Sequence, residues 1–257
     1  MRSKKTLLPA CLLILTVGMV AMADHHKEKK AAGPMKALLV TGGGYHDYKK
    51  QELILTEGTK ARIPVEWSVI HKDAAGTKEE LSKKGWADPY DIVVYNLCHA
   101  HEKDASFVES LVKIHEAGKP AVAIHCTMHS YHWKIPGEKK LWAEMIGVTS
   151  PRHGKHAPIT VTNVKPDHPV MKQFPKEWVT PKGELYHIDK TWPTATVLAT
   201  GSIDGGKKSH DCIWVNEYGK GRIFGTTLGH HNETMAADEY LDMVSNAMLW
   251  ATKRSGE

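Results

Sequence analysis

Short apolar segments alternate with longer amphipathic segments through the first half of the chain. Apolar stretches occur at 36–41, 65–71, 91–98 and 121–126, and helices are expected at 47–61, from Thr77 and at 104–117. Strands joined through helices of this length run parallel, because each right-handed crossover helix carries the chain back to the end of the sheet where the previous strand began. The pattern predicts an α/β fold with a doubly wound, mainly parallel sheet.

The second half of the chain has a different, proline-rich pattern. A helix is expected near 139–146, and further strands at 159–164, 184–189 and 196–200. Residues 212–218 and 222–228 flank Gly219-Lys220-Gly221, which indicates a β-hairpin, and 238–252 predicts a closing amphipathic helix. We expect one domain over residues 35–254, with these strands as an extension of the sheet.

The amino end is typical of an export signal. Arg2, Lys4 and Lys5 precede an apolar run and the small-residue motif Ala21-Met22-Ala23. The run is about half of the roughly 20 residues that a bilayer span needs. We therefore predict a signal peptide at 1–23, a flexible leader at 24–34, and export to the periplasm or the extracellular space without a membrane anchor. The mature start Asp24-His25-His26 also forms a possible Cu(II) or Ni(II) motif.

Charge and cysteine content limit the possible partners. Removing the three cations of the signal from the formal net charge of +5 leaves +2, which argues against a nucleic-acid partner. Export would leave Cys98, Cys126 and Cys212, and an odd number of cysteines leaves at least one thiol free. We interpret Cys126 as a buried or metal-facing thiol.

Histidines follow the predicted strands at their carboxyl ends. The chain contains 17 histidines, and those expected at this rim or in the intervening segments include His46, His99, His101, His125, His129, His132, His153, His156, His187, His230 and His231. Ligands of open α/β sheets bind outside the carboxyl ends of the strands, so we expect these rings to meet in one cleft.

Imidazole clusters favour metal binding or proton transfer near neutral pH. The pairs His125/His129 and His153/His156 have spacings that place two rings on one side of a helical turn, so we predict these four as ligands of a divalent transition metal such as zinc. We predict catalytic roles for His125, His230 and Glu184. The competing interpretation is that each histidine is a hydrogen-bonded structural residue.

Residues near the first strand and in the tryptophan-containing segments are candidates for substrate binding. Gly42-Gly43-Gly44 lacks the spacing of a dinucleotide fingerprint and the Lys-Ser/Thr pair of a phosphate loop, so no nucleotide cofactor is expected and a tight turn is favoured. Asp47 is interpreted as a helix cap. We predict substrate contacts from Gly43, Gly44, Tyr45, His46 and Trp133, while Trp142 and Trp192 offer either stacking surfaces or core packing.

Several segments resemble the successive landmarks of the ThuA-like (trehalose-utilisation) family. They are LLVTGGGYHDY (38–48), AVAIHCTMHSY (121–131), DHPVMKQFP (167–175), GELYHI (183–188) and YGKGRIFGTTLGHHNETM (218–235). The resemblance implies a flavodoxin-like sheet related to class I glutamine amidotransferases. The nucleophilic cysteine of those enzymes would fall at His125, with Cys126 displaced by one, so their catalytic triad is not carried over.

The resemblance implies a role in the metabolism of trehalose or related disaccharides, including keto-sugars. We therefore expect an exported protein that acts on a disaccharide or keto-glycoside, with a small carbohydrate as its partner. A non-catalytic carbohydrate- or metal-binding module on the same fold is the alternative. A cysteine hydrolase using Cys126, His230 and Glu233 ranks last, because the glycines that relieve a strained nucleophile turn are absent.

Overall fold

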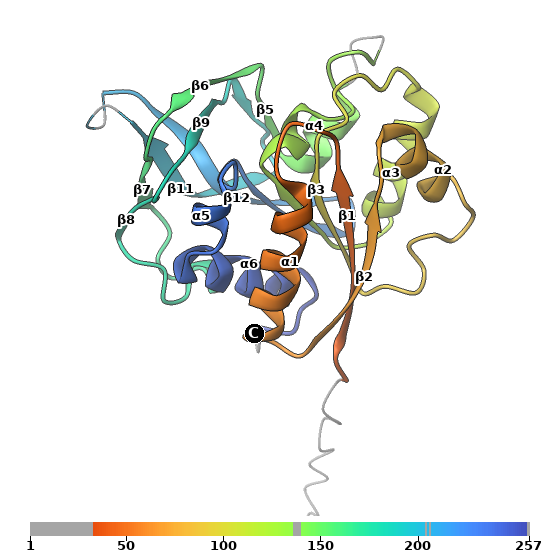
Figure 1. The fold of residues 1–257 in the computed structure, drawn as a ribbon, viewed down its shortest axis with the longest axis horizontal. Coiled ribbons are helices and arrows are strands. Elements are labelled where there is room, and N and C mark those ends of the chain that lie inside the picture. The colour runs from red at the N-terminus through yellow and green to blue at the C-terminus, as the bar shows by residue number, and fades with distance from the viewer. Residues whose placement is uncertain (1–32, 136–139, 204, 206, 256–257) are drawn as a thin grey trace, which may run out of the picture. The chain divides into compact units, whose positions relative to one another are not determined.

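The strands predicted in the first half form the parallel part of a nine-stranded sheet in a computed structural model that describes residues 33–135, 140–203, 205 and 207–255 (Figure 1). The predicted signal and most of the predicted leader lie outside these residues. The sheet order is β2-β1-β3-β4-β13-β12-β11-β7-β8. The parallel strands are β1 (Met35–Gly42), β2 (Val65–His71), β3 (Ile92–Leu97), β4 (Ala121–Ile124) and β13 (Gly221–Thr226).

The remaining strands of the main sheet form an antiparallel extension, which contains the strands predicted at 159–164 and 196–200 but not the one predicted at 184–189. β13 pairs with β12 (Ser209–Tyr218) as a hairpin, followed across the sheet by β11 (Ala195–Ser202), β7 (Thr160–Asn163) and β8 (Glu177–Val179). Two small antiparallel pairs, β5 (Val148–Thr149) with β10 (Lys190–Thr191) and β6 (Arg152–His156) with β9 (Glu184–His187), are separate from the main sheet. The α/β fold with a mostly parallel sheet and a hairpin is thus confirmed.

The central strands are apolar almost throughout, so they bury side chains on both faces of the sheet and create two cores. Leu39 and Val94 point to one face and Leu38 and Val93 to the other, since successive side chains of a strand alternate. The first face packs against α1 (Tyr48–Lys60), α5 (Asn232–Met235) and α6 (Asp238–Ala251). The second packs against α2 (Ala74–Leu81), α3 (Ala105–Glu116) and α4 (Leu141–Ile146). Helices on both faces make the sheet doubly wound.

Short helical segments and caps position the loops at the carboxyl ends of the strands. β4 ends at Ile124, and His125–His129 form a 3₁₀ helix, η1, so the predicted strand was two residues too long; a second 3₁₀ turn, η2, covers Pro169–Met171. The Asp47 side chain accepts a hydrogen bond from the Lys50 backbone at 3.2 Å, which confirms its helix-capping role. Within the described residues, no helix has the length and apolar composition needed to cross a bilayer.

Candidate metal centre

Loops from both halves of the chain bring histidines together at the carboxyl ends of the parallel strands. His46 follows β1, His125 follows β4, and His230 follows β13, while the β6–β9 pair contributes His153, His156 and Glu184. The rings of His46 and His230 lie 4.7 Å apart, and those of His125 and His230 lie 5.3 Å apart. The convergence of imidazoles expected from the sequence is present for these residues. It is absent for His187, whose ring stacks on that of His210, and for His99, whose Nδ1 lies 3.0 Å from the Tyr131 hydroxyl.

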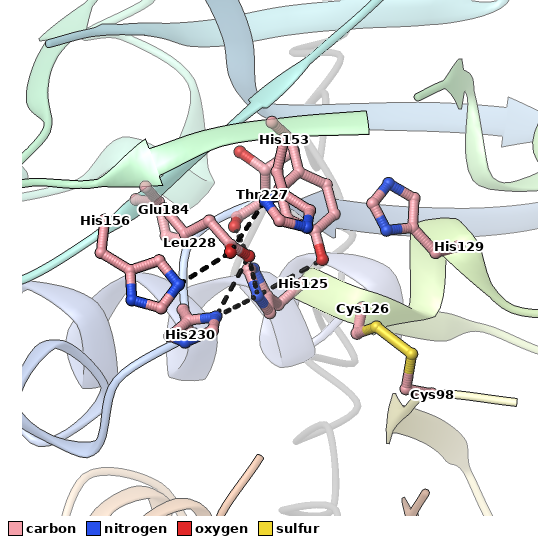
Figure 2. Close-up of polar contacts among 12 residues, drawn as sticks. Cys98, His125, Cys126, His129, His153, His156, Glu184, Thr227, Leu228 and His230 are labelled. Atoms are coloured by element: carbon pink, nitrogen blue, oxygen red, sulfur yellow. Dashed lines mark hydrogen bonds and ion pairs between the residues drawn. A yellow bond between two sulfur atoms is a disulfide. The ribbon is translucent and has the colours of Figure 1, made fainter. Parts of the chain in front are cut away.

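The Glu184 carboxylate is the hub of this cluster (Figure 2). Its Oε2 lies 3.1 Å from His230 Nδ1 and 3.4 Å from His125 Nε2. Its Oε1 lies 2.9 Å from His153 Nδ1 and 3.0 Å from His156 Nε2. Only 4% of the Glu184 side chain is exposed, so four imidazoles surround a nearly buried carboxylate.

His125 occupies the strained turn between β4 and η1. Its φ of 47° lies in the left-handed region, which non-glycine residues adopt at a cost of roughly 1–3 kcal/mol. The ring Nδ1 lies 2.6 Å from the Thr227 carbonyl oxygen. Because a carbonyl only accepts, Nδ1 carries the hydrogen and donates it, which leaves the lone pair of the neutral ring on Nε2. That nitrogen faces His230, Tyr186 and Glu184.

His46 places a second imidazole beside His125 and His230, and unlike the ring of His125 its ring makes no hydrogen bond within the described residues. Both of its ring nitrogens are buried and, among the described residues, neither has a hydrogen-bond partner. Burial, reinforced by His125 and His230, lowers the pKa of His46 to about 3. The ring is therefore neutral at pH 7 and offers a lone pair into the cluster.

Burial and the contacts between charged groups have opposite effects on the pKa values of Glu184 and His125. Burial raises the pKa of the Glu184 carboxyl, but contacts with the surrounding histidines outweigh this effect and hold that pKa below its ordinary value. Burial lowers the pKa of His125 despite the opposing effect of Glu184. An ionised carboxylate therefore faces the lone pair of a neutral imidazole at 3.4 Å, an arrangement that a cation between them would stabilise.

Two groups of histidines in the described part of the chain are placed to hold a metal ion. The inner group is His46, His125 and His230, and the outer group is His156, His230 and His231; within each, the ligand atoms lie within 4.8 Å of one another. Of the four ligands predicted from spacing, His125 belongs to the inner group and His156 to the outer one. His153 contacts Glu184, and His129 Nε2 lies 3.1 Å from the Ser150 hydroxyl. Their roles as ligands stay predictions.

Neither pair of histidines lies on an α-helical turn, the geometry that the prediction from spacing requires. His125 and His129 lie in a 3₁₀ helix, where residues four apart do not share a face, and the rings point to different partners. His153 and His156 lie on strand β6, where residues three apart normally face opposite sides. A register shift between them, of the kind a β-bulge produces, allows both to reach Glu184.

Cys126 is not the buried or metal-facing thiol expected from the sequence. It forms a disulfide with Cys98, which follows the neighbouring strand β3, and the two lie 28 residues apart in sequence. The prediction of at least one free cysteine is confirmed by Cys212, whose pKa burial raises. A cysteine-hydrolase mechanism using Cys126 lacks its nucleophile in this disulfide-bonded structure.

A cleft beside the hub has two compartments of different chemistry. The apolar compartment, about 280 Å³, is lined by residues including Ala100, Cys126, Trp133 and Tyr186. The polar compartment, about 470 Å³, is lined by residues including Gly44, Asp47, Lys182, Asn232 and Glu233. Tyr45, His46 and His230 line both. These volumes are near the range of about 300–1,000 Å³ typical of small-molecule sites.

The predicted substrate-binding residues are distributed around this cleft. Gly44, Tyr45, His46 and Trp133 line it, and Trp133 is 45% exposed. Gly43 lines neither compartment; a Cβ there would lie 2.6 Å from the Cys98 carbonyl oxygen, so the glycine admits a close approach of the neighbouring backbone. Sequence reasoning missed Tyr186, although its position two residues after Glu184 on β9 places it on the same face of the strand.

A family model described as trehalose utilisation matches residues 36–251. The chain belongs to the ThuA family. This membership suggests a role related to sugars, in agreement with the resemblance found in the sequence. A comparison with curated proteins gives no match.

Solved structures similar to this ThuA chain support its fold. A putative ThuA-like protein from Parabacteroides merdae is 19% identical, with a TM-score of 0.66 over 85% of this chain and 90% of that one. A second from Bacteroides uniformis is 15% identical, with a TM-score of 0.64 over 88% and 95%. A putative GMP synthase protein from Thermoplasma acidophilum is 15% identical, with a TM-score of 0.53 over 84% and 94%.

Proposed function

We propose that this chain is an exported enzyme that acts on a disaccharide or keto-glycoside with a divalent transition metal held by His46, His125, His230 and Glu184. The observation that carries the proposal is the pairing of the His125 Nε2 lone pair with the ionised Glu184 oxygen, beside the unpartnered nitrogens of His46. This differs from the ligand set predicted from spacing, because only His125 is common to both.

The separations of three of the four proposed donor atoms fit a tetrahedral metal. His125 Nε2, His230 Nδ1 and Glu184 Oε2 form a triangle with sides of 3.3, 3.1 and 3.4 Å. Zinc bonds of about 2.0–2.1 Å set separations of about 3.3 Å between the ligands of a regular tetrahedron. The hydrogen bond from His125 to Thr227 is the kind of contact that fixes the tautomer of a metal-binding histidine.

The cleft supports a two-ring substrate. The compartments meet at His46 and His230, so a disaccharide lying across both would place its connecting region at the hub. Trp133 offers an aromatic face to one ring, and Lys182 and Glu233 offer polar groups to the other. A bound metal would polarise a carbonyl or glycosidic oxygen there.

Elemental analysis and activity assays test this proposal together. We expect the purified protein to contain a divalent transition metal and to turn over trehalose or an oxidised disaccharide, with activity lost after chelation. His46→Ala should remove the metal and lower turnover about 100-fold, the upper end of the loss seen when a residue that supports a metal ligand is removed. His187→Ala, a substitution on β9 outside both metal groups, is the matched control.

Two results would contradict the enzyme proposal. Sugar binding without turnover across this substrate panel would favour the non-catalytic module. Activity that survives complete metal removal would exclude the proposed role of the metal.

The disulfide supports the export part of the proposal. Disulfides such as Cys98–Cys126 persist in oxidising compartments and are rare in the reducing cytosol. Amino-terminal sequencing of the secreted or periplasmic protein should give Asp24 as the first residue, and an intact Met1 in the cytosolic fraction would contradict export.

A further inference from the structure

The outer histidine group remains unexplained by a single metal at the inner group. It consists of His156 on β6 together with His230 and His231, which precede α5. The rings of His156 and His230 lie 4.4 Å apart, and those of His156 and His231 lie 5.2 Å apart. His230 thus belongs to both groups and links them.

Glu184 divides its two oxygens between the groups. Oε2 faces His125 and His230, whereas Oε1 faces His156 at 3.0 Å and His153 at 2.9 Å (Figure 2). An ionised carboxylate offers about four lone-pair sites on its two oxygens, and a buried carboxylate normally has partners for its oxygens. Here each oxygen has its own pair of imidazoles, which is the arrangement of a carboxylate that bridges two cations.

The backbone of β6 is shaped to serve the outer group. The pairing register shifts between His153 and His156, and the shift turns both rings towards Oε1. Both rings are about half exposed, with 47% and 56% of their side chains accessible, so a cation can enter from the solvent. Without a metal, both rings satisfy Oε1 by donating N–H groups; a cation would instead bind the lone pairs of the other tautomers.

We propose that the centre holds two divalent cations bridged by Glu184, the second bound by Glu184 Oε1, His156 and His231, with His153 beside it. This inference rests on the proposed function, because the inner group provides the first cation. Two-metal sites place their ions about 3.5–4 Å apart and clamp one oxygen-rich substrate between them. The second cation would bind substrate oxygen at the open, solvent-facing side of the hub.

Metal stoichiometry of the full mature chain tests the second site. The protein would be dialysed against Zn²⁺, and bound zinc counted per chain by elemental analysis. All samples would carry His26→Ala, which removes the possible amino-terminal metal motif. We expect two equivalents of zinc per chain in this background. A variant that also carries His156→Ala and His231→Ala should keep only the inner equivalent, and a separate variant that also carries His46→Ala should keep only the outer one. His187→Ala should keep two, and thermal melting would verify that each variant is folded.

The outcomes separate this proposal from the proposed function. A single equivalent that His46→Ala removes and the outer substitutions leave unchanged would overturn the second site while the inner metal stands. No bound zinc in any folded sample would overturn both. Two equivalents that the outer substitutions do not reduce would also overturn the assignment of the second cation to His156 and His231.

Discussion

Single residues at the centre are oriented by contacts that come from elsewhere in the chain. Thr227, a residue of the loop after β13, fixes the His125 ring through its backbone carbonyl. Tyr186 stacks on His129 with ring centroids 4.3 Å apart, and its hydroxyl lies 3.3 Å from His125 Nε2. These contacts fix how the imidazoles are presented to the cleft, so loss of one supporting residue should disturb several of them.

Trp133 provides a test of sugar binding that is independent of the metal. It lines the apolar compartment and lies 4.6 Å from the His129 ring, centroid to centroid. We expect Trp133→Ala to weaken disaccharide binding about tenfold, since aromatic stacking contributes about 0.5–1.5 kcal/mol beyond buried area. Isothermal titration calorimetry measures this directly.

Trp192 supplies the matched control for that experiment. Its indole N–H lies 3.3 Å from the Thr149 hydroxyl and its ring contacts the Lys190 ammonium, away from both compartments. Trp192→Ala should leave sugar affinity unchanged. Equal losses of affinity in the two variants would contradict a stacking role for Trp133.

At the scale of elements, the disulfide joins the ends of two neighbouring parallel strands. Cys98 follows β3 and Cys126 lies in η1 directly after β4, so the bond ties together two loops that line the apolar compartment. The bond closes a segment of 28 residues. The loop-entropy model gives a stabilisation of about 3–4 kcal/mol for a loop of this length.

Removing the disulfide should therefore lower stability without changing the sheet. We expect Cys98→Ala with Cys126→Ala to lower the melting temperature by several degrees in calorimetry, and added reductant to lower that of the wild type similarly. Cys212→Ala, which removes the free buried thiol, is the control, because reductant should lower its melting temperature as much as that of the wild type. A wild-type melting temperature insensitive to reductant that reaches the disulfide would contradict this expectation.

The elements differ in how far the sequence determined them. The parallel strands at 36–41, 65–71 and 91–98 were predicted because each is a short, mainly apolar segment followed by a helical segment. β6 was not predicted, since Arg152–His156 is polar throughout and is held by pairing with β9. The disulfide was not predicted, because the sequence does not show that the strands ending near Cys98 and Cys126 are neighbours in the sheet.

The candidate centre shows the same division. Convergence of His125 and His230 followed from strand ends that share one rim, and Glu184 was named from its place near the extension. The detailed ligand grouping depends on η1 being a 3₁₀ helix and on the shifted register of β6. Both depend on tertiary contacts, which a local spacing argument does not contain.

For the whole molecule, buried histidines make stability sensitive to acid. His115 on α3 belongs to neither histidine group, and its ring contacts the Tyr95 hydroxyl at 2.9 Å and the Lys119 carbonyl at 2.8 Å. Burial lowers the pKa of His115 to about 4 from 6.5. The folded state therefore resists a proton that the unfolded chain accepts between these values.

This shift fixes the direction of the pH dependence. The contribution of neutral His115 to the free energy of unfolding is complete above pH 6.5 and is lost as the pH falls towards about 4. The total loss is about 3 kcal/mol. Urea unfolding at several pH values should show a shallower loss of stability in His115→Gln than in the wild type over this window. Parallel curves for the two proteins would contradict the assignment.

The origin of the donors at the hub has a mechanical consequence. His125 and His230 come from loops of the parallel half of the sheet, whereas Glu184, His153 and His156 come from the separate β6–β9 ribbon. Departure of the ribbon from the sheet would break the two contacts that Glu184 makes with His125 and His230 and would expose an ionised group, whereas the contacts of Glu184 with His153 and His156 lie within the ribbon. We therefore expect the β6–β9 ribbon to detach from the sheet cooperatively, so that limited proteolysis detects only the fully attached and the fully detached states.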